Sequence, residues 1–191
     1  MKSKVIRKII HVLIGIIIIL FVVFGILNTR LLFYFLLLSI ILSLLSIKVK
    51  IPAIYKLVLI YKKEKEMPPG RGFIFFIFGS LLALKLFQRD IALASMAILT
   101  FSDSASYLFG AFLGKFKILK NNKNIEGTIF GILIGTLAAL FFVNFIEAFL
   151  ACSIAMLAEY LEFRIANNTI DDNLIIPLVA GTTIYLLRLI I

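Results

Sequence analysis

The stretch from Ser102 to Gly131 reads S-D-S-A-S-Y-L-F-G-A-F-L-G-K-F-K-I-L-K-N-N-K-N-I-E-G-T-I-F-G. It joins the end of one long apolar segment to the start of the next through a basic loop, and it places Asp103 within the first apolar segment. A charge at bilayer depth is costly and is rarely kept without a function. The stretch therefore predicts a helical membrane protein with a functional carboxylate at depth.

The composition extends this interpretation to the whole chain of 191 residues, of which 62% are hydrophobic and only 16% are charged. The mean hydropathy is +1.13, and the apolar residues gather in runs of roughly 15 to 22, the length that crosses a bilayer as a helix. We expect an all-α integral membrane protein with one transmembrane catalytic domain over residues 1–191. Seven spans are predicted, at residues 9–27, 31–47, 73–87, 91–114, 127–147, 149–164 and 173–190.

The basic residues give the expected orientation. Sixteen of the 20 lysines and arginines fall at the N-terminus or in every second connection, whereas the other connections hold only Arg30 and Arg89. Positive charge is retained on the cytoplasmic side, which predicts a cytoplasmic N-terminus and an outer C-terminus in a multi-pass protein of the cytoplasmic membrane. The connection 48–72 contains a predicted interfacial helix at 51–61. The net charge of +10 follows from this topology and from contact with the lipid bilayer, and no nucleic-acid-binding module is expected.

Two further features of the chain limit the classes of protein. The N-terminal basic patch precedes an apolar run that is long and lacks a cleavage pattern, so we expect a retained first span and no signal peptide. The single cysteine, Cys152, excludes an intramolecular disulfide and a cysteine-built metal site. The sequence does not fix the oligomeric state, and a homodimer is one option.

The conspicuous polar side chains gather on the predicted cytoplasmic side, where nucleotides are available. These candidates are His11, Arg71, Lys115, Lys117, Lys120, Lys123, Glu126, Glu159, Asp171, Asp172 and Asn173. Each group also has a structural interpretation. The lysines follow from the positive-inside rule, Asp171 and Asp172 can cap the last helix, and glycines and serines spaced by four favour close helix packing.

Asp103 is the candidate for which a purely structural role is the weakest explanation. It lies near the middle of its predicted span, and a straight helix would place it about 18 Å from the membrane surface. The serines on both sides of it favour starting a helix over continuing one. We therefore expect a broken helix with Asp103 facing a cavity open to the cytoplasm. A carboxylate in that setting suits Mg²⁺, which prefers oxygen ligands and bridges phosphates.

This set of residue types fits phosphoryl transfer, which requires a metal and cations around the phosphates and a group that orients the attacking hydroxyl. The predicted Mg²⁺ ligands are Asp103, Asp171 and Asp172. The predicted phosphate-binding cations are Arg71, Lys115, Lys117, Lys120 and Lys123. Glu159, Glu126 or His11 can orient or deprotonate an alcohol. No Walker-type or kinase glycine-rich loop is present, so the nucleotide site is of another kind.

Five short motifs in this chain resemble, in the same order, those of the CTP-dependent lipid kinases, the family that includes dolichol kinase, phytol kinase and the yeast-type diacylglycerol kinase. They are R-K-I-I-H at Arg7–His11, P-G-R-G at Pro69–Gly72, S-D-S-A-S-Y-L-F-G-A-F-L-G-K at Ser102–Lys115, K-N-I-E-G-T at Lys123–Thr128 and D-D-N-L-I-I-P-L at Asp171–Leu178. The resemblance implies transfer of the γ-phosphate of CTP to the hydroxyl of a membrane lipid, with a divalent cation. The acceptor it implies is a polyprenol or dolichol first, then a phytol-type alcohol or diacylglycerol.

The resemblance also implies a set of nucleotide and metal residues. They are Asp103, Lys123, Glu126, Gly127, Asp171, Asp172 and Asn173. The family often has Lys-Ser where this chain has Lys123-Asn124, and an Asn amide can meet a phosphate or cap the following helix. Two alternatives stay open. One is a lipid cytidylyltransferase resembling the distantly related CDP-diacylglycerol synthases, whose C-terminal H-G-G…D-R-x-D run is absent here. The other is a small ion or solute transporter, for which no internal repeat is apparent.

Overall fold

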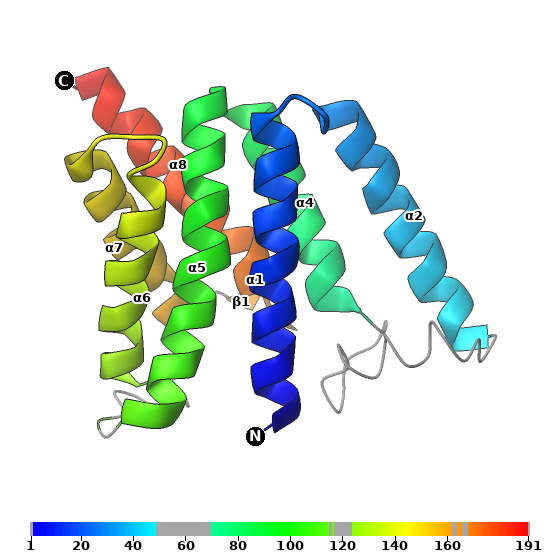
Figure 1. Ribbon diagram of the computed structural model, residues 1–191, viewed down its shortest axis with the longest axis horizontal. Helices are drawn as coiled ribbons and strands as arrows, with labels where there is room; N and C mark the ends of the chain where they lie inside the picture. Colours follow the sequence, from blue (N-terminus) through cyan, green and yellow to red (C-terminus); the bar gives the residue numbers. More distant parts are fainter. Residues whose placement is uncertain are drawn as a thin grey trace.

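The computed structural model describes residues 2–48, 70–114, 116, 124–161, 164–165 and 168–190. Within these ranges the chain forms seven α-helices and one pair of short strands (Figure 1). The helices are α1 (Lys2–Val23), α2 (Thr29–Lys48), α4 (Arg71–Leu86), α5 (Arg89–Leu113), α6 (Ile125–Ala139), α7 (Phe145–Tyr160) and α8 (Asp172–Ile190). The interfacial helix predicted at 51–61 lies outside the described residues, as do Lys115, Lys117, Lys120 and Lys123.

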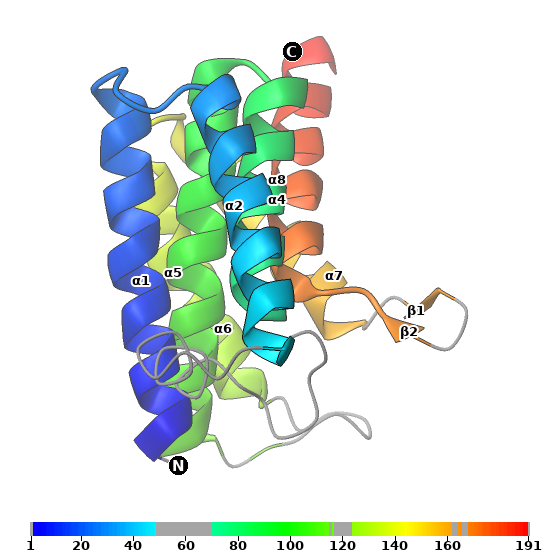
Figure 2. The same ribbon diagram turned by 90° about the vertical axis from the view of Figure 1, so that its right-hand side faces the viewer.

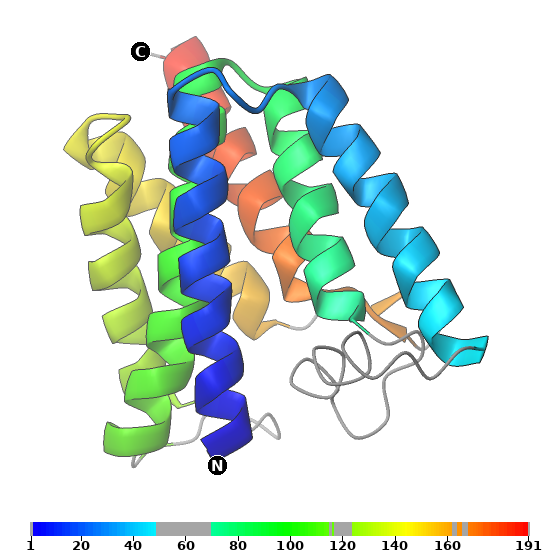
Figure 3. The same cartoon turned by 45° about the vertical axis from the view of Figure 1, so that its right-hand side comes forward.

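Helix α5 lies at the centre of the bundle and contacts α1, α4, α6, α7 and α8 (Figure 1, Figure 2). The apolar window of α5 is 78% buried, against 17% for those of α1 and α2, which lie at the periphery. Helix α2 packs on α4, and Figure 3 shows these two helices beside each other. Of the four candidate spans in the described part of the chain, the one that carries Asp103 is therefore the most enclosed.

Within the described ranges, four helices are long and apolar enough to cross a membrane. They are Val5–Val23, Thr29–Ser46, Arg89–Leu113 and Asp172–Ile190. Helix α6 is apolar but shorter, and α4 and α7 have 16 residues each. These helices fit a helical membrane protein, and the count of seven spans remains a prediction. The two termini lie at opposite ends of the bundle, as an odd number of spans requires (Figure 1).

The predicted boundary between the fifth and sixth spans is wrong. We expected spans at 127–147 and 149–164, but a turn at 140–144 separates α6 from α7. The cause is a capping box, in which Asn144 Oδ1 accepts from Glu147 N at 2.9 Å and Glu147 Oε2 accepts from Asn144 N at 3.3 Å. The chain is apolar on both sides of this turn, so hydropathy alone does not reveal the helix start.

The connection between α7 and α8 contains a two-residue antiparallel strand pair, β1 (Arg164–Ile165) and β2 (Asn168–Thr169). We predicted an all-α protein, so this pair is an addition to the expected fold. Figure 2 shows it projecting from the side of the bundle. The helical class of the protein is unchanged.

The predicted break in the helix around Asp103 is also wrong, because α5 runs without interruption from Arg89 to Leu113. Hydroxyl side chains in this helix bond back to its own carbonyls, as when Thr100 Oγ1 donates to Met96 O at 2.8 Å. Such a bond satisfies the hydroxyl and leaves the helical ladder in place. The carboxylate of Asp103 finds its partner on another helix instead of on unwound backbone.

Small residues allow α5 and α6 to approach closely, as their four-residue spacing predicted. A Cβ added at Gly127 would overlap the carbonyl oxygen of Ser106, and one added at Gly135 would overlap Ser102 Oγ. A Cβ at Gly131 would lie 3.0 Å from Ser102 O, closer than ordinary contact. The packing role of these glycines is confirmed.

Ionic contacts join several helices at the end of the bundle that holds the C-terminus. Arg188 of α8 donates to Asp90 of α5 at 2.6 Å and to the two carboxylate oxygens of Glu147 of α7 at 2.7 and 3.2 Å. We call these three residues the Arg188 cluster. At the same end, Arg89 of α5 donates to the carbonyl oxygen of Val22 at 2.7 Å, near the end of α1. Four helices are thus connected by charged side chains at this end.

Candidate functional site

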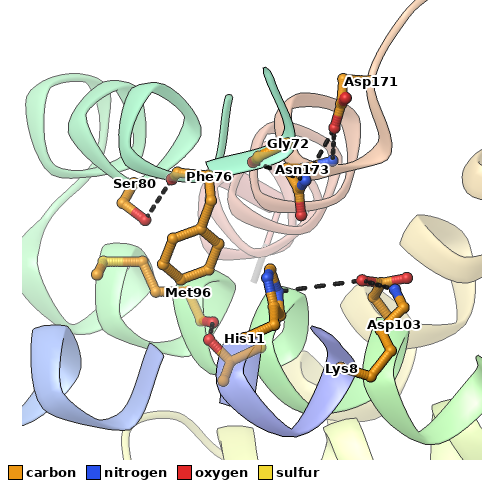
Figure 4. A network of polar contacts seen from close by, with 10 residues as sticks. Lys8, His11, Gly72, Phe76, Ser80, Met96, Asp103, Asp171 and Asn173 are labelled. Atoms are coloured by element: carbon orange, nitrogen blue, oxygen red, sulfur yellow. Dashed lines mark hydrogen bonds and ion pairs between the residues drawn. The ribbon is translucent and has the colours of Figure 1, made fainter. Parts of the chain in front are cut away.

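The candidate site is centred on Asp103, whose carboxylate is met by two side chains from α1 (Figure 4). Lys8 Nζ lies 2.5 Å from Asp103 Oδ2, and His11 Nε2 lies 4.0 Å from the same oxygen. The exposed fractions of the three side chains are only 14% for Lys8, 11% for His11 and 10% for Asp103. Lys8 and His11 are three residues apart, so they share one face of the helix. The structure therefore brings together two residues that the sequence selected as candidates, Asp103 and His11. It adds Lys8, which the sequence did not select.

A glycine on α1 permits this approach. Gly15 lies one turn beyond His11 and packs so closely on Thr100 of α5 that an added Cβ would overlap the threonine side chain. Thr100 precedes Asp103 by three residues on the same helix. The tight contact between Gly15 and Thr100 therefore keeps the polar face of α1 within reach of the carboxylate.

Aromatic rings border the site on two sides. The imidazole of His11 meets the ring of Phe76 on α4 edge-on, with 4.6 Å between centroids and an angle of 69° between planes. Lys8 Nζ lies 5.7 Å from the ring centroid of Tyr107, which follows Asp103 by one turn of α5. A cation near an aromatic face is attracted by the ring quadrupole. His11 is thus held by packing, whereas the ammonium group of Lys8 has two neighbours that attract it.

The start of α8 faces this cluster from the opposite side (Figure 4). Asp171 Oδ1 accepts from the backbone N of Asn173 at 3.1 Å and from its side-chain Nδ2 at 2.9 Å. The first of these bonds is a helix N-cap, so the capping interpretation of Asp171 is confirmed. Asn173 Nδ2 also donates to Gly72 O of α4 at 3.1 Å. Asn173 Oδ1 is buried and has no hydrogen-bond partner in the described part of the chain, so it is an acceptor open to a ligand.

Proline changes the hydrogen bonding at the start of α8. Pro177 lies inside this helix and has no N–H, so the carbonyl of Asn173, four residues earlier, lacks its helical donor. Gly79 of α4 packs so closely on this carbonyl that a Cβ there would overlap the oxygen. The two helices are held together at this point, which explains why Gly72 lies within hydrogen-bond distance of Asn173.

The residues at the start of α6 contact the end of α5. Asn124 Nδ2 donates to Gly110 O at 2.5 Å, and Glu126 Oε1 accepts from Phe116 N at 3.1 Å. Asn124 occupies the N-cap position of α6, but its side chain makes no capping hydrogen bond, so the predicted capping role is wrong. Contact of Asn124 or Gly127 with a phosphate remains a prediction.

The other predicted residues occupy separate positions in the described structure. Glu159 is 3% exposed near the end of α7, Asp172 is the first residue of α8, and Arg71 is the first residue of α4. Within the described ranges, no three side chains of His, Cys, Asp or Glu gather closely enough to hold a metal ion. The assignment of Asp103, Asp171 and Asp172 to one metal therefore remains a prediction.

Sequence reasoning did not select Lys8, because it stands among other N-terminal basic residues that the positive-inside rule explains. Spacing alone does not distinguish Lys8, because Arg7, four residues before His11, and Lys8, three residues before it, both lie on the helix face of His11. The Arg188 cluster was also missed. Its members come from three distant parts of the chain and have no spacing pattern in common.

Comparison with known proteins gives a partial similarity to a lipid kinase. No protein-family model and no solved structure matches the chain. The uncharacterized protein MJ1137 of Methanocaldococcus jannaschii is 32% identical over 133 residues, which make up 69% of this chain and 65% of that protein. CTP-dependent diacylglycerol kinase 1 of Eremothecium gossypii is 26% identical over 89 residues, which make up 46% of this chain and 28% of that protein. The chain spans less than two thirds of the length of either relative.

Proposed function

We propose that this protein is a membrane enzyme that transfers the γ-phosphate of CTP to the hydroxyl group of a membrane lipid. The observation that carries the proposal is the cluster of Lys8, His11 and Asp103, which is buried between apolar helices. A carboxylate in such a setting is rarely kept without a function. The similarity of 89 residues to a CTP-dependent diacylglycerol kinase supports CTP and a lipid as the two substrates.

In the proposed reaction, the hydroxyl oxygen of the lipid attacks the γ-phosphorus of CTP. The bond between this phosphorus and the β,γ-bridging oxygen breaks, CDP leaves with the bonding electrons, and the hydroxyl proton passes to a base. His11 is our candidate for that base, because Nε2 is buried, has no hydrogen-bond partner among the described residues and lies 4.0 Å from Asp103 Oδ2. The Asp103 carboxylate would stabilise the positive charge that His11 acquires.

The carboxylates of the site suit Mg²⁺, since this ion prefers oxygen ligands. The proposed ligands are Asp103, Asp171 and Asp172, and since these do not gather into one group among the described residues, one or two of them would hold the ion together with the phosphates. The carboxamide oxygen of Asn173, which has no hydrogen-bond partner in the described part of the chain, offers one more ligand of the same kind. When bound, the ion would neutralise charge on the transferred phosphoryl group. Further contacts to the phosphates would come from Arg71, Lys115, Lys117, Lys120 and Lys123, and from Asn124 and Gly127. Glu126 and Glu159 are the alternative candidates to orient or deprotonate the lipid hydroxyl.

The acceptor lipid would approach from the bilayer along α1. This helix presents Lys8 and His11 to the interior, while Ile6, Ile9 and Leu13 on its other side are 49%, 48% and 55% exposed. These exposed side chains give the lipid an apolar surface, and its hydroxyl would enter the bundle at the edge of α1 to reach the polar face of the same helix. We propose a polyprenol or dolichol first, then a phytol-type alcohol or diacylglycerol, with the site open to the cytoplasm in the cytoplasmic membrane.

The test is a transfer assay with the full-length protein in lipid nanodiscs, Mg²⁺ and CTP labelled at the γ-phosphate. We expect label to appear in a lipid alcohol. Asp103→Asn is expected to lower the rate by about a hundredfold or more, because it removes a charge that acts on the transition state. Asp90→Asn is the matched control, since it removes a carboxylate from the same helix at the end that holds the Arg188 cluster.

A parallel assay with CTP labelled at the α-phosphate distinguishes the rival chemistry. Transfer of the α-label into lipid would identify a cytidylyltransferase and refute the kinase. Equal loss of activity in Asp103→Asn and Asp90→Asn, at equal thermal stability, would refute the special role of Asp103.

A further inference from the structure

We propose that Ser104 binds the lipid alcohol: its hydroxyl donates a hydrogen bond to the alcohol oxygen, while the alcohol donates its own hydrogen to His11 Nε2. This inference rests on the proposed function and adds a substrate-binding residue to it. It begins from two buried polar atoms, Ser104 Oγ and His11 Nε2, which have no hydrogen-bond partner in the described part of the chain.

The first step concerns the register of α1 on α5. Gly15 of α1 packs on Thr100 of α5, and Lys8 Nζ of α1 lies 5.7 Å from the ring centroid of Tyr107 of α5. Lys8 precedes Gly15 by seven residues, and Tyr107 follows Thr100 by seven residues. The two helices are therefore antiparallel, and a step back along α1 corresponds to an equal step forward along α5.

This register places Ser104 at the level of His11. His11 lies four residues before Gly15, and Ser104 lies four residues after Thr100. Residues spaced by four share one face of a helix, so Ser104 lies on the face of α5 that meets α1. The two unpartnered atoms therefore belong to neighbouring side chains of one helix contact, and they do not bond to each other.

The hydroxyl of Ser104 differs from other buried hydroxyls of the bundle. Ser80, Ser95 and Thr100 each donate to a carbonyl of their own helix at 2.8 or 2.9 Å, which satisfies a hydroxyl within a helix. Ser104 is only 1% exposed and has no such partner among the described residues. Because a buried polar group without a partner costs stability, the free hydroxyl of Ser104 fits a partner that a ligand supplies.

An alcohol hydroxyl matches these two atoms. It has one hydrogen to donate and two lone pairs that accept, while the serine hydroxyl can donate and a neutral imidazole nitrogen can accept. One alcohol oxygen at about 2.7–3.0 Å from Ser104 Oγ and from His11 Nε2 would satisfy both. Asp103 Oδ2 already accepts from Lys8, so His11 is the better acceptor for the hydrogen. The second lone pair of the alcohol then remains available for attack on the γ-phosphorus.

The first experiment measures alcohol binding without nucleotide or metal. The full-length protein in phosphatidylcholine nanodiscs is unfolded by heat with geranylgeraniol, with geranylgeraniol methyl ether, or with neither. A ligand that binds the folded state raises the unfolding midpoint. We expect geranylgeraniol to raise the midpoint of the wild type. The ether should raise it less, because it has no hydrogen to donate to His11.

Ser104→Ala is the test variant, and Ser95→Ala is the matched control, since Ser95 is a buried serine of the same helix whose hydroxyl is already bonded. Ser104→Ala should bind geranylgeraniol about two- to tenfold more weakly, as fits loss of one neutral hydrogen bond. Its midpoint without alcohol should equal or exceed that of the wild type, because an unpartnered hydroxyl has been removed. Ser95→Ala should respond to the alcohol as the wild type does.

Transfer kinetics with CTP labelled at the γ-phosphate give a second readout. Ser104→Ala should raise the KM for the alcohol by about the same factor and change kcat less, because the bond is present before the reaction as well as during it. Ser95→Ala should leave both constants at their wild-type values.

The outcomes separate this inference from the kinase itself. A wild-type alcohol response in Ser104→Ala, or equal responses to the alcohol and its ether, would overturn the role of Ser104 while leaving the kinase intact. A lower midpoint of Ser104→Ala without alcohol would overturn it too, because the hydroxyl would then have a partner within the protein. A Ser104-dependent response in a protein that transfers no phosphate would overturn the kinase and support the hydroxyl site.

Discussion

The contact between α5 and α6 predicts opposite outcomes for two glycine-to-alanine substitutions. In Gly135→Ala, the new Cβ would overlap Ser102 Oγ and lie 2.7 Å from Cys152 Sγ and 3.0 Å from Ser102 Cβ. All three neighbours belong to buried helical residues, so none can move away easily. In Gly110→Ala, the nearest atoms would lie 3.6 to 3.8 Å away, which is ordinary contact.

The expected magnitudes follow from two opposing terms. Overpacking of a tight core costs up to about 3 kcal/mol, while replacing a mid-helix glycine by alanine gains about 1 kcal/mol. The net loss for Gly135→Ala is therefore about 2 kcal/mol, which corresponds to a midpoint lower by about 4–8 °C for a chain of this size. Gly110→Ala has only the gain, so its midpoint should be unchanged or higher.

The chain offers a direct assay for this comparison. It has no tryptophan and one cysteine, Cys152, which is fully buried. A thiol-reactive fluorogenic dye therefore reports unfolding as Cys152 becomes accessible. Ser102→Ala combined with Gly135→Ala should recover part of the loss, because it removes the Oγ atom. A wild-type midpoint for Gly135→Ala, or a larger loss for Gly110→Ala than for Gly135→Ala, would refute the packing argument.

Three other expectations concern catalysis, stability and topology. His11→Gln should lower the rate of phosphoryl transfer by about a hundredfold or more, because this is the range of a lost general base. Binding of a non-transferable CTP analogue should be kept. An unchanged rate would contradict His11 as the base and leave Glu126 or Glu159 as candidates. Arg188→Ala should lower the thermal midpoint by several degrees, because it leaves two carboxylates close together without their cation. The activity of the folded fraction should be retained. A wild-type midpoint would mean that the Arg188 cluster contributes no stability. Asn28→Cys in a Cys152→Ala background should react with a membrane-impermeant maleimide added to intact cells, and labelling only after lysis would reverse the predicted orientation.

The helices and their order could be predicted from the sequence, because each apolar run is bounded by charges or turns. The boundary between α6 and α7 could not be found by hydropathy, since the capping box of Asn144 and Glu147 interrupts a stretch that is apolar on both sides. Its N-x-x-E spacing was the available signal. The close packing of the glycines on α6 was predicted correctly, because small residues at a spacing of four leave little else to explain them.

The environment of Asp103 was predicted only in part. Its depth within an apolar segment follows from the sequence, but the contact with His11 was not predicted and the expected broken helix does not occur. The partner of Asp103 is Lys8, which lies 95 residues away in the sequence, and no local pattern predicts such a contact. The same is true of Arg188, which meets Asp90 across 98 residues. Long-range pairing depends on which helix faces are turned toward each other, and the sequence of one chain does not give this.

The Arg188 cluster and the bond from Arg89 to α1 fix the register of α1, α5, α7 and α8 at the end of the bundle that holds the C-terminus. Local opening of a protein begins where few contacts must be broken, and an opening at this end must break several charge-assisted hydrogen bonds together. Backbone amides near Arg188 should therefore be among the last to exchange with deuterium. This end of the bundle then acts as a fixed point about which the helices can tilt.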